Sequence, residues 1–132
     1  MPRVELGQDK TTGMVGAEYE KVMRRAEIDA ATSAAILGGF DYEINGERLH
    51  FSYDAFDQQN FADTANACLM IKGGAQGLPD TVVWNAYREN GELARVTLTP
   101  DEFLTLYAAG ALTHKATCMA QGGAQKSELE GE

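Results

Sequence analysis

Two histidines and two cysteines are the side chains of this sequence best suited to nucleophilic or metal chemistry. The histidines are His50 and His114, and the cysteines are Cys68 and Cys118. Cys118 follows His114 by four residues, so a helix would place both side chains on one face, as a thiol–imidazole nucleophile or two metal ligands require. A zinc site needs three or four ligands, and no third suitable residue stands nearby. We therefore expect no metal site and no catalytic thiol.

The spacing of the cysteines also bears on disulfide formation. They stand 50 positions apart, outside any CxxC motif, and each lies in an apolar run with helical spacing. Cysteines in such runs are usually core residues. We expect two buried free thiols rather than a disulfide, which suits a reducing cytoplasm.

Carboxylates are densest between residues 38 and 66, where six acids accompany one base, Arg48. Their order does not match a calcium loop, and no aromatic groove for a sugar accompanies them as in a glycoside hydrolase. The glycine pairs form neither GxGxxG nor GxxxxGK[ST]. We expect no catalytic residue and no cofactor, and a solvated acidic face that could bind a protein. The candidate residues of this face are Asp41, Glu43, Glu47, Asp54, Asp57 and Asp63.

Composition excludes several classes of partner. The chain has 132 residues, 44% of them hydrophobic, and a net charge of −9. Nucleic acids and anionic membranes attract positive surfaces, so we expect neither as a partner. No apolar run approaches the roughly 18 residues of a membrane span, and the first residues lack the apolar stretch of a signal peptide. These features predict a protein of the cytoplasm.

Hydrophobic spacing and turn residues predict the elements that would position these groups. A helix is expected over residues 17–37, because apolar side chains recur at steps of three and four. Asn-Gly turns predict two β-hairpins, one around Asn45 and one around Asn90. A second helix is expected over residues 54–71, and a third over 100–120, where Thr99, Pro100 and Glu102 form a helix start. The apolar face of the first helix comprises Tyr19, Val22, Met23, Ala26, Ala30 and Ala34.

The order of these elements predicts an α+β fold. Helix, hairpin, helix, hairpin and helix follow one another, and the two hairpins would form a small antiparallel sheet packed on the helices. We expect one α+β domain over residues 17–121, preceded by an extended arm at 1–16 and followed by an acidic tail at 122–132. Gly110 either weakens the third helix by about 1 kcal/mol relative to alanine or permits a close crossing with another helix.

Several short motifs in this order resemble a domain found near the C-terminal end of bacteriophage and prophage tail proteins, notably tail-fibre and tail-fibre-assembly polypeptides. The resemblance covers about residues 20–115. In the first half, the matching positions are Arg24, Ile28, Gly38, Gly39, Phe40, Tyr42, Gly46, Phe51, Asp54, Asn60 and Phe61. In the second half, they are Trp84, Val96, Thr97, Leu98, Thr99, Phe103, Leu104 and Leu106.

The resemblance implies a non-enzymatic protein that binds other tail proteins or copies of itself. It would be found in the bacterial host cytoplasm during assembly and in the virion tail. This chain departs from the pattern in its acidity, in its glycine-rich residues 1–16, in Gly110, and in Gln58, where a small hydroxyl residue is usual. The departures leave open a fibre component, an assembly chaperone or a small decoration protein.

Two other functions are compatible with the sequence. A small acidic phage protein could inhibit a host defence protein, with the acidic face meeting a basic surface that normally binds nucleic acid. Alternatively, a pocket between hairpins and helices could hold a small molecule through Arg48, His50, Gln58 and Asn60. Charge reversal at Asp54 and Asp57 would test the first idea, and a solid core at that place would remove the second.

Overall fold

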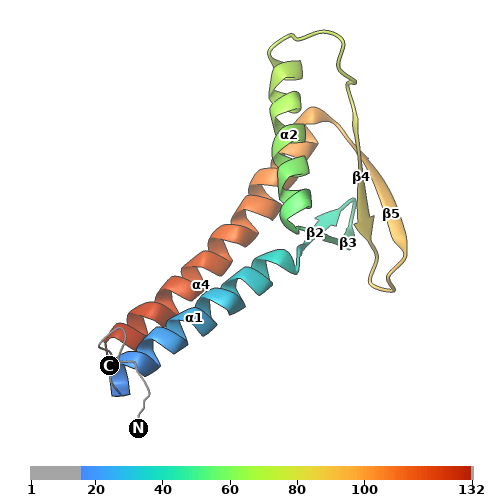
Figure 1. Ribbon diagram of the computed structural model, residues 1–132. Helices are drawn as coiled ribbons and strands as arrows, with labels where there is room; N and C mark the ends of the chain where they lie inside the picture. The colour runs from blue at the N-terminus through green and yellow to red at the C-terminus, as the bar shows by residue number, and fades with distance from the viewer. Residues whose placement is uncertain (1–15, 132) are drawn as a thin grey trace. The chain divides into compact units, whose positions relative to one another are not determined.

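The computed structural model describes residues 16–131 and has an α+β fold (Figure 1). The elements are α1 (Gly16–Leu37), β2 (Phe40–Ile44), β3 (Glu47–Phe51), α2 (Ala55–Lys72), β4 (Val82–Tyr87), β5 (Leu93–Leu98), α3 (Pro100–Thr105), the π-helix η1 (Leu106–Leu112) and α4 (Thr113–Glu130). The predicted class, a small antiparallel sheet packed on helices, is confirmed. The arm predicted for residues 1–16 lies outside the described residues, apart from Gly16, where α1 begins.

The described residues form two compact units. The larger comprises residues 34–118 and holds the sheet, α2, α3 and η1. It accounts for most of the single domain expected over residues 17–121. The smaller comprises residues 16–33 and 119–131, which belong to α1 and α4. Within residues 16–131, no helix combines the length and apolar content that crossing a membrane requires.

The sheet has the strand order β2-β3-β4-β5, and every neighbouring pair is antiparallel. β2 pairs with β3 from Phe40↔Phe51 to Ile44↔Glu47, and β4 pairs with β5 from Val82↔Leu98 to Tyr87↔Leu93. The two hairpins meet at the pair His50↔Tyr87. Asn45 and Gly46 both have positive φ, of 52° and 82°, as the two-residue turn between β2 and β3 requires.

The core of the larger unit is aromatic and lies between the sheet and its helices (Figure 1). Phe61 of α2 stands at its centre and is fully buried. Its ring centroid lies 4.6 Å from that of Trp84 on β4 and 5.6 Å from that of Phe103 on α3. Because alternate residues of a strand face opposite ways, Trp84 and Ala86 face this core while Val83 and Tyr87 face away from it.

Local chemistry fixes the starts of two helices. The Asp54 carboxylate accepts a hydrogen bond from the Asp57 backbone N–H at 2.8 Å, and the Asp57 side chain accepts from the Asp54 N–H. Thr99 and Glu102 make the same reciprocal pair at the start of α3, with Pro100 in the first turn. Each pair satisfies backbone donors that a helix start otherwise leaves without partners.

Two glycines allow close approaches around Phe40. Gly39 has φ +87°, and an added Cβ would collide with the Phe51 carbonyl oxygen. Gly110 lies in η1, where an added Cβ would stand 2.8 Å from Cε2 of Phe40. The close crossing considered for Gly110 therefore occurs against a strand rather than another helix. The π-helical turns of η1 were not predicted.

Two predictions about the helices of the smaller unit were wrong. The third helix does not end near residue 120: α4 continues to Glu130, so most of the predicted acidic tail is helical. Packing explains the continuation, because Gly122 lies against Thr32 of α1 and Leu129 is buried. Ion pairs between α1 and α4 add to this packing, joining Asp29 to Lys126 at 2.5 Å and Arg25 to Glu130 at 3.9 Å.

The second correction concerns the apolar face of α1. Most of that face is exposed, and a different set of side chains is half-buried. The half-buried residues of α1 are Lys21, Val22, Arg25, Ile28, Thr32 and Ile36. Arg25 and Thr32 lie within this set because they contact α4, and the spacing of apolar residues carries no information about a helix so distant in sequence.

Candidate functional site

The outer face of the sheet carries a cluster formed by Asp41, Arg48 and His50. His50 Nδ1 lies 2.8 Å from Oδ1 of Asp41, and Nε2 lies 3.0 Å from the Gly38 carbonyl oxygen. Both partners accept hydrogen bonds, so the ring can donate to both at once only when it carries both protons. Arg48 Nε donates to Oδ2 of Asp41 at 3.2 Å. These bonds occupy the carboxylate and both ring nitrogens, and they join β2 to β3.

The surroundings of Asp41 lower the pKa of its carboxyl below the usual 3.8. The largest cause is the hydrogen bond from His50, and the Arg48 guanidinium adds to it. An aspartate whose pKa is lower in the folded protein stabilises the fold at pH values above its unfolded pKa. That contribution is lost as the pH falls through the folded value.

We expect Asp41→Asn to lower the free energy of unfolding at pH 7 by about 0.2–1 kcal/mol, the range for exposed ion pairs. The difference from the native protein should shrink as the pH falls below the usual value of 3.8 and through the lowered folded pKa, because the native carboxyl becomes protonated there. Urea denaturation at pH 7 and pH 3 measures it. Glu43→Gln removes the same charge from the same face of β2 and is the control. A deficit of equal size at both pH values would contradict this assignment.

The six carboxylates of the predicted acidic face do not gather on one side of the sheet. Asp41 and Glu43 lie on the outer face of β2, where Asp41 is already paired. Glu47 accepts from Arg88 at 2.9 Å. Asp54 and Asp57 form the helix start described above, and Asp63 accepts from Gln59 at 2.9 Å on the surface of α2. Most of these acids therefore have partners within the fold.

A broad hollow of about 510 Å³ lies beside the outer-face cluster. Its walls come from β2, β3, η1 and α4 and include Arg48, His50 and His114, but neither Gln58 nor Asn60. Gln58 Nε2 instead donates to the Tyr53 carbonyl oxygen at 3.2 Å. The four residues expected to line one ligand pocket, Arg48, His50, Gln58 and Asn60, therefore do not line this hollow together.

His114 and Cys118 share a face of α4, as their spacing predicted. His114 Nε2 lies 3.1 Å from the Ile36 carbonyl oxygen, and Cys118 Sγ lies 3.8 Å from Nδ1. A ring that donates through Nε2 leaves Nδ1 to accept from the thiol. Cys118 and Cys68 are both buried and free, which confirms that prediction, and burial raises the pKa of Cys68. Among the described residues, no three His, Cys, Asp or Glu side chains come together as metal ligands would.

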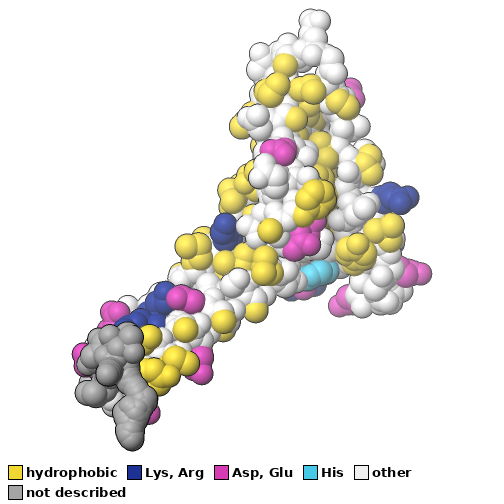
Figure 2. Space-filling model, in the orientation of Figure 1, with side chains coloured by type: hydrophobic (Ala, Val, Ile, Leu, Met, Phe, Trp, Pro, Cys, Tyr) yellow, Lys and Arg dark blue, Asp and Glu magenta, His cyan; other side chains and the backbone are white. Residues whose placement is uncertain are grey.

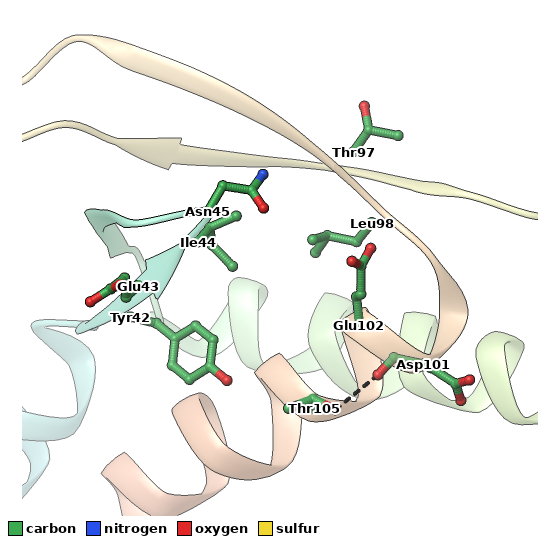
Figure 3. A pocket seen from close by; sticks show the side chains of 9 residues that line it. All are labelled: Tyr42, Glu43, Ile44, Asn45, Thr97, Leu98, Asp101, Glu102 and Thr105. Atoms are coloured by element: carbon green, nitrogen blue, oxygen red, sulfur yellow. Dashed lines mark hydrogen bonds between the residues drawn. The ribbon is translucent and has the colours of Figure 1, made fainter.

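A second hollow, of about 320 Å³, lies between the first hairpin and the start of α3 (Figure 3). Ile44 and Leu98 point toward one another across it, the Tyr42 ring lies below Ile44 in this view, and the Glu102 carboxylate stands beside Leu98. That carboxylate accepts from the Thr99 backbone N–H at 2.8 Å. Thr105 Oγ1 donates to the Asp101 carbonyl oxygen at 3.0 Å. Those two hydrogen bonds serve the helix itself, so the inward-pointing residues left to meet a ligand are mainly apolar.

The outer face of the sheet also exposes large apolar side chains. Val83 is 59% exposed, and the cross-strand partners Tyr87 and Leu93 are 38% and 44% exposed. We call these three residues the outer patch. Hydrophobic side chains are visible over the β4–β5 hairpin and over α2 (Figure 2). Alternation along a strand puts Val83 and Tyr87 on one side of β4, but it does not reveal that this side is uncovered.

Comparison with known proteins identifies a family. Searches of curated proteins and of solved structures found no match. The model of one family, described as Domain of unknown function (DUF4376), matches residues 19–132. The match includes the whole sheet-bearing unit, nearly all of α1 and all of α4. The chain therefore belongs to the DUF4376 family.

Proposed function

We propose that this chain is a non-enzymatic component of bacteriophage or prophage tails that acts through contacts with other tail proteins. The motifs shared with tail-fibre and tail-fibre-assembly polypeptides support the setting. The outer patch is the observation that supports action through contacts with another protein. Exposed apolar clusters of this kind mark protein interfaces, since leaving them in water opposes the hydrophobic effect.

The geometry of the outer patch suits a protein partner better than a small molecule. The β4–β5 face is open, and its apolar side chains alternate with Asn85, Arg95 and Thr97, which are also exposed. A surface that mixes exposed apolar side chains with polar ones is the usual composition of a protein interface. The partner is another protein of the same tail, met in the host cytoplasm during assembly and retained in the virion.

Affinity capture from cells that are producing the encoding phage tests the proposal. The tagged native chain should retain a tail protein of that phage, identified by mass spectrometry. The triple variant Val83→Ser, Tyr87→Ser, Leu93→Ser should lose it. The double variant Asn85→Ser, Arg95→Ser changes two polar cross-strand partners on the same face and should retain it.

Two results would count against the proposal. Capture of host proteins without any tail protein would refute the tail assignment. Equal capture of a tail protein by the native chain and the triple variant would refute the outer patch as the contact. Circular dichroism of each variant shows whether the fold is intact.

Inhibition of a host defence protein through the acidic residues has less support. Asp54 and Asp57 stabilise the start of α2, and Asp41 and Glu47 pair with cations of the same chain. Charge reversal at Asp54 or Asp57 would therefore weaken the fold as well as any interface. Asp54→Asn keeps an oxygen that can cap the helix, so it separates loss of charge from loss of the cap.

A further inference from the structure

We propose that α1 mediates self-association by packing, parallel and in register, against α1 of a second copy of this chain. The contact is a stripe of Tyr19, Met23, Ala26 and Ala30, called the α1 stripe below. Tyr19 and Met23 are 55% and 46% exposed, and both alanines are exposed. Apolar side chains show on the surface along this helical segment (Figure 2).

The spacing of the α1 stripe is that of a coiled coil. Its members are separated by four, three and four residues, which is a seven-residue repeat. Met23 and Ala30 take one of the two inward positions of the repeat, and Tyr19 and Ala26 take the other. Alanines at a helix interface let two backbones approach closely, and Tyr19 and Met23 supply apolar area.

The smaller unit has little core of its own. Within residues 16–33 and 119–131, the buried residues are Gly122 and Leu129. Helices of this length owe most of their stability to the packing of an apolar face. Arg25 and Thr32 contact α4. At 100° per residue, these two residues lie roughly half a turn around α1 from the α1 stripe. A second copy can therefore cover the stripe without displacing α4.

Charges beside the α1 stripe select a parallel arrangement. Glu20 and Glu27 flank one side, and Val22 and Asp29 flank the other. In a parallel pair, the side of one copy that carries Val22 and Asp29 faces the side of the other copy that carries Glu20 and Glu27. Val22 then meets Glu27 of the second copy, and no acid meets an acid. In an antiparallel pair, Glu20 would face Glu27 of the second copy, and like charges repel. Asp29 is also paired with Lys126 within its own chain.

The molar mass in solution, measured by light scattering on the full chain, tests self-association. The native protein should have a multiple of the 14.3 kDa chain mass. Ala30→Glu should weaken self-association by on the order of a hundredfold, because it buries unpaired charges at the contact. Ala31→Glu makes the same change at the next residue, which is exposed and off the stripe, and should keep the native mass.

Oxidative cross-linking tests the parallel register. Ala26→Cys should form a disulfide-linked dimer, because residue 26 of each copy meets its counterpart in a parallel pair. Ala31→Cys should not, and the native cysteines are buried. A native mass of one chain, an unchanged mass for Ala30→Glu, or equal cross-linking of both cysteine variants would each overturn the proposal. Neither test uses a tail protein, so failure here leaves the tail assignment to its own experiment.

Discussion

Replacing Phe61 by alanine is expected to lower the free energy of unfolding by about 3–5 kcal/mol. The Phe61 ring is fully buried, and its loss removes contacts with aromatic rings from five other elements or connecting segments. Its centroid lies within 6.0 Å of those of Phe40, Tyr53, Trp84, Phe103 and Tyr107. Those rings are held by the sheet and by two helices, so they can close only part of the resulting cavity.

Urea denaturation followed by Trp84 fluorescence measures the effect, because Trp84 is the only tryptophan and contacts the Phe61 ring. The control is Phe56→Ala on the same helix. Phe56 is 74% exposed, so its removal should change the free energy of unfolding by no more than about 0.5 kcal/mol. A typical domain is stable by only 5–15 kcal/mol, so the Phe61 variant should lose a large fraction of its stability. Similar losses for both variants would contradict the central place of Phe61.

Gly39→Ala is expected to destabilise the protein by about 2–5 kcal/mol, since two costs combine. Gly39 has φ +87°, a conformation that alanine adopts only with strain. The added methyl group would also collide with the Phe51 carbonyl oxygen and stand 2.7 Å from Nε2 of His50. The backbone at residues 38–39 would have to move, and the hydrogen bond between His50 and the Gly38 carbonyl oxygen would be strained.

Gly46→Ala separates the two costs of the Gly39 substitution. Gly46 has φ +82°, but no atom lies within 4 Å of the Cβ that would be added. It should therefore show only the conformational cost, about 1 kcal/mol. Equal losses of stability for the two variants, again from urea denaturation, would show that the collision at Gly39 is relieved at no cost.

Local sequence chemistry predicted the parts of the fold that depend on neighbouring residues. The Asn45-Gly46 turn needs two residues that tolerate positive φ, and the Thr99–Glu102 pair needs a hydroxyl and a carboxylate three residues apart. Both signals lie within four residues, and both are present. The α+β class follows from such signals, because two hairpins between helices have few ways to bury their apolar sides.

Features that depend on distant contacts could not be predicted in this way. Gly122 resembles a helix end in the sequence, yet in the structure it gives α4 room to lie against Thr32, some 90 residues earlier. The pairing of Glu47 with Arg88 depends on how two hairpins meet. For the candidate site, the sequence located the acidic residues, but it did not reveal that Asp41 and Glu47 are paired or that one face of β4 is uncovered.

The narrow junction between the hairpins has a consequence for how the protein folds. Each hairpin closes over a few residues, a step that takes microseconds, whereas β3 and β4 meet through His50↔Tyr87 after a long connection. The short pairing between β3 and β4 contributes little to holding the hairpins together. Their assembly therefore depends on the aromatic side chains of α2 and α3, which pack against the sheet. The sheet is thus two early local structures joined late by a shared core, and the rate-limiting step should respond to Phe61 more than to either turn.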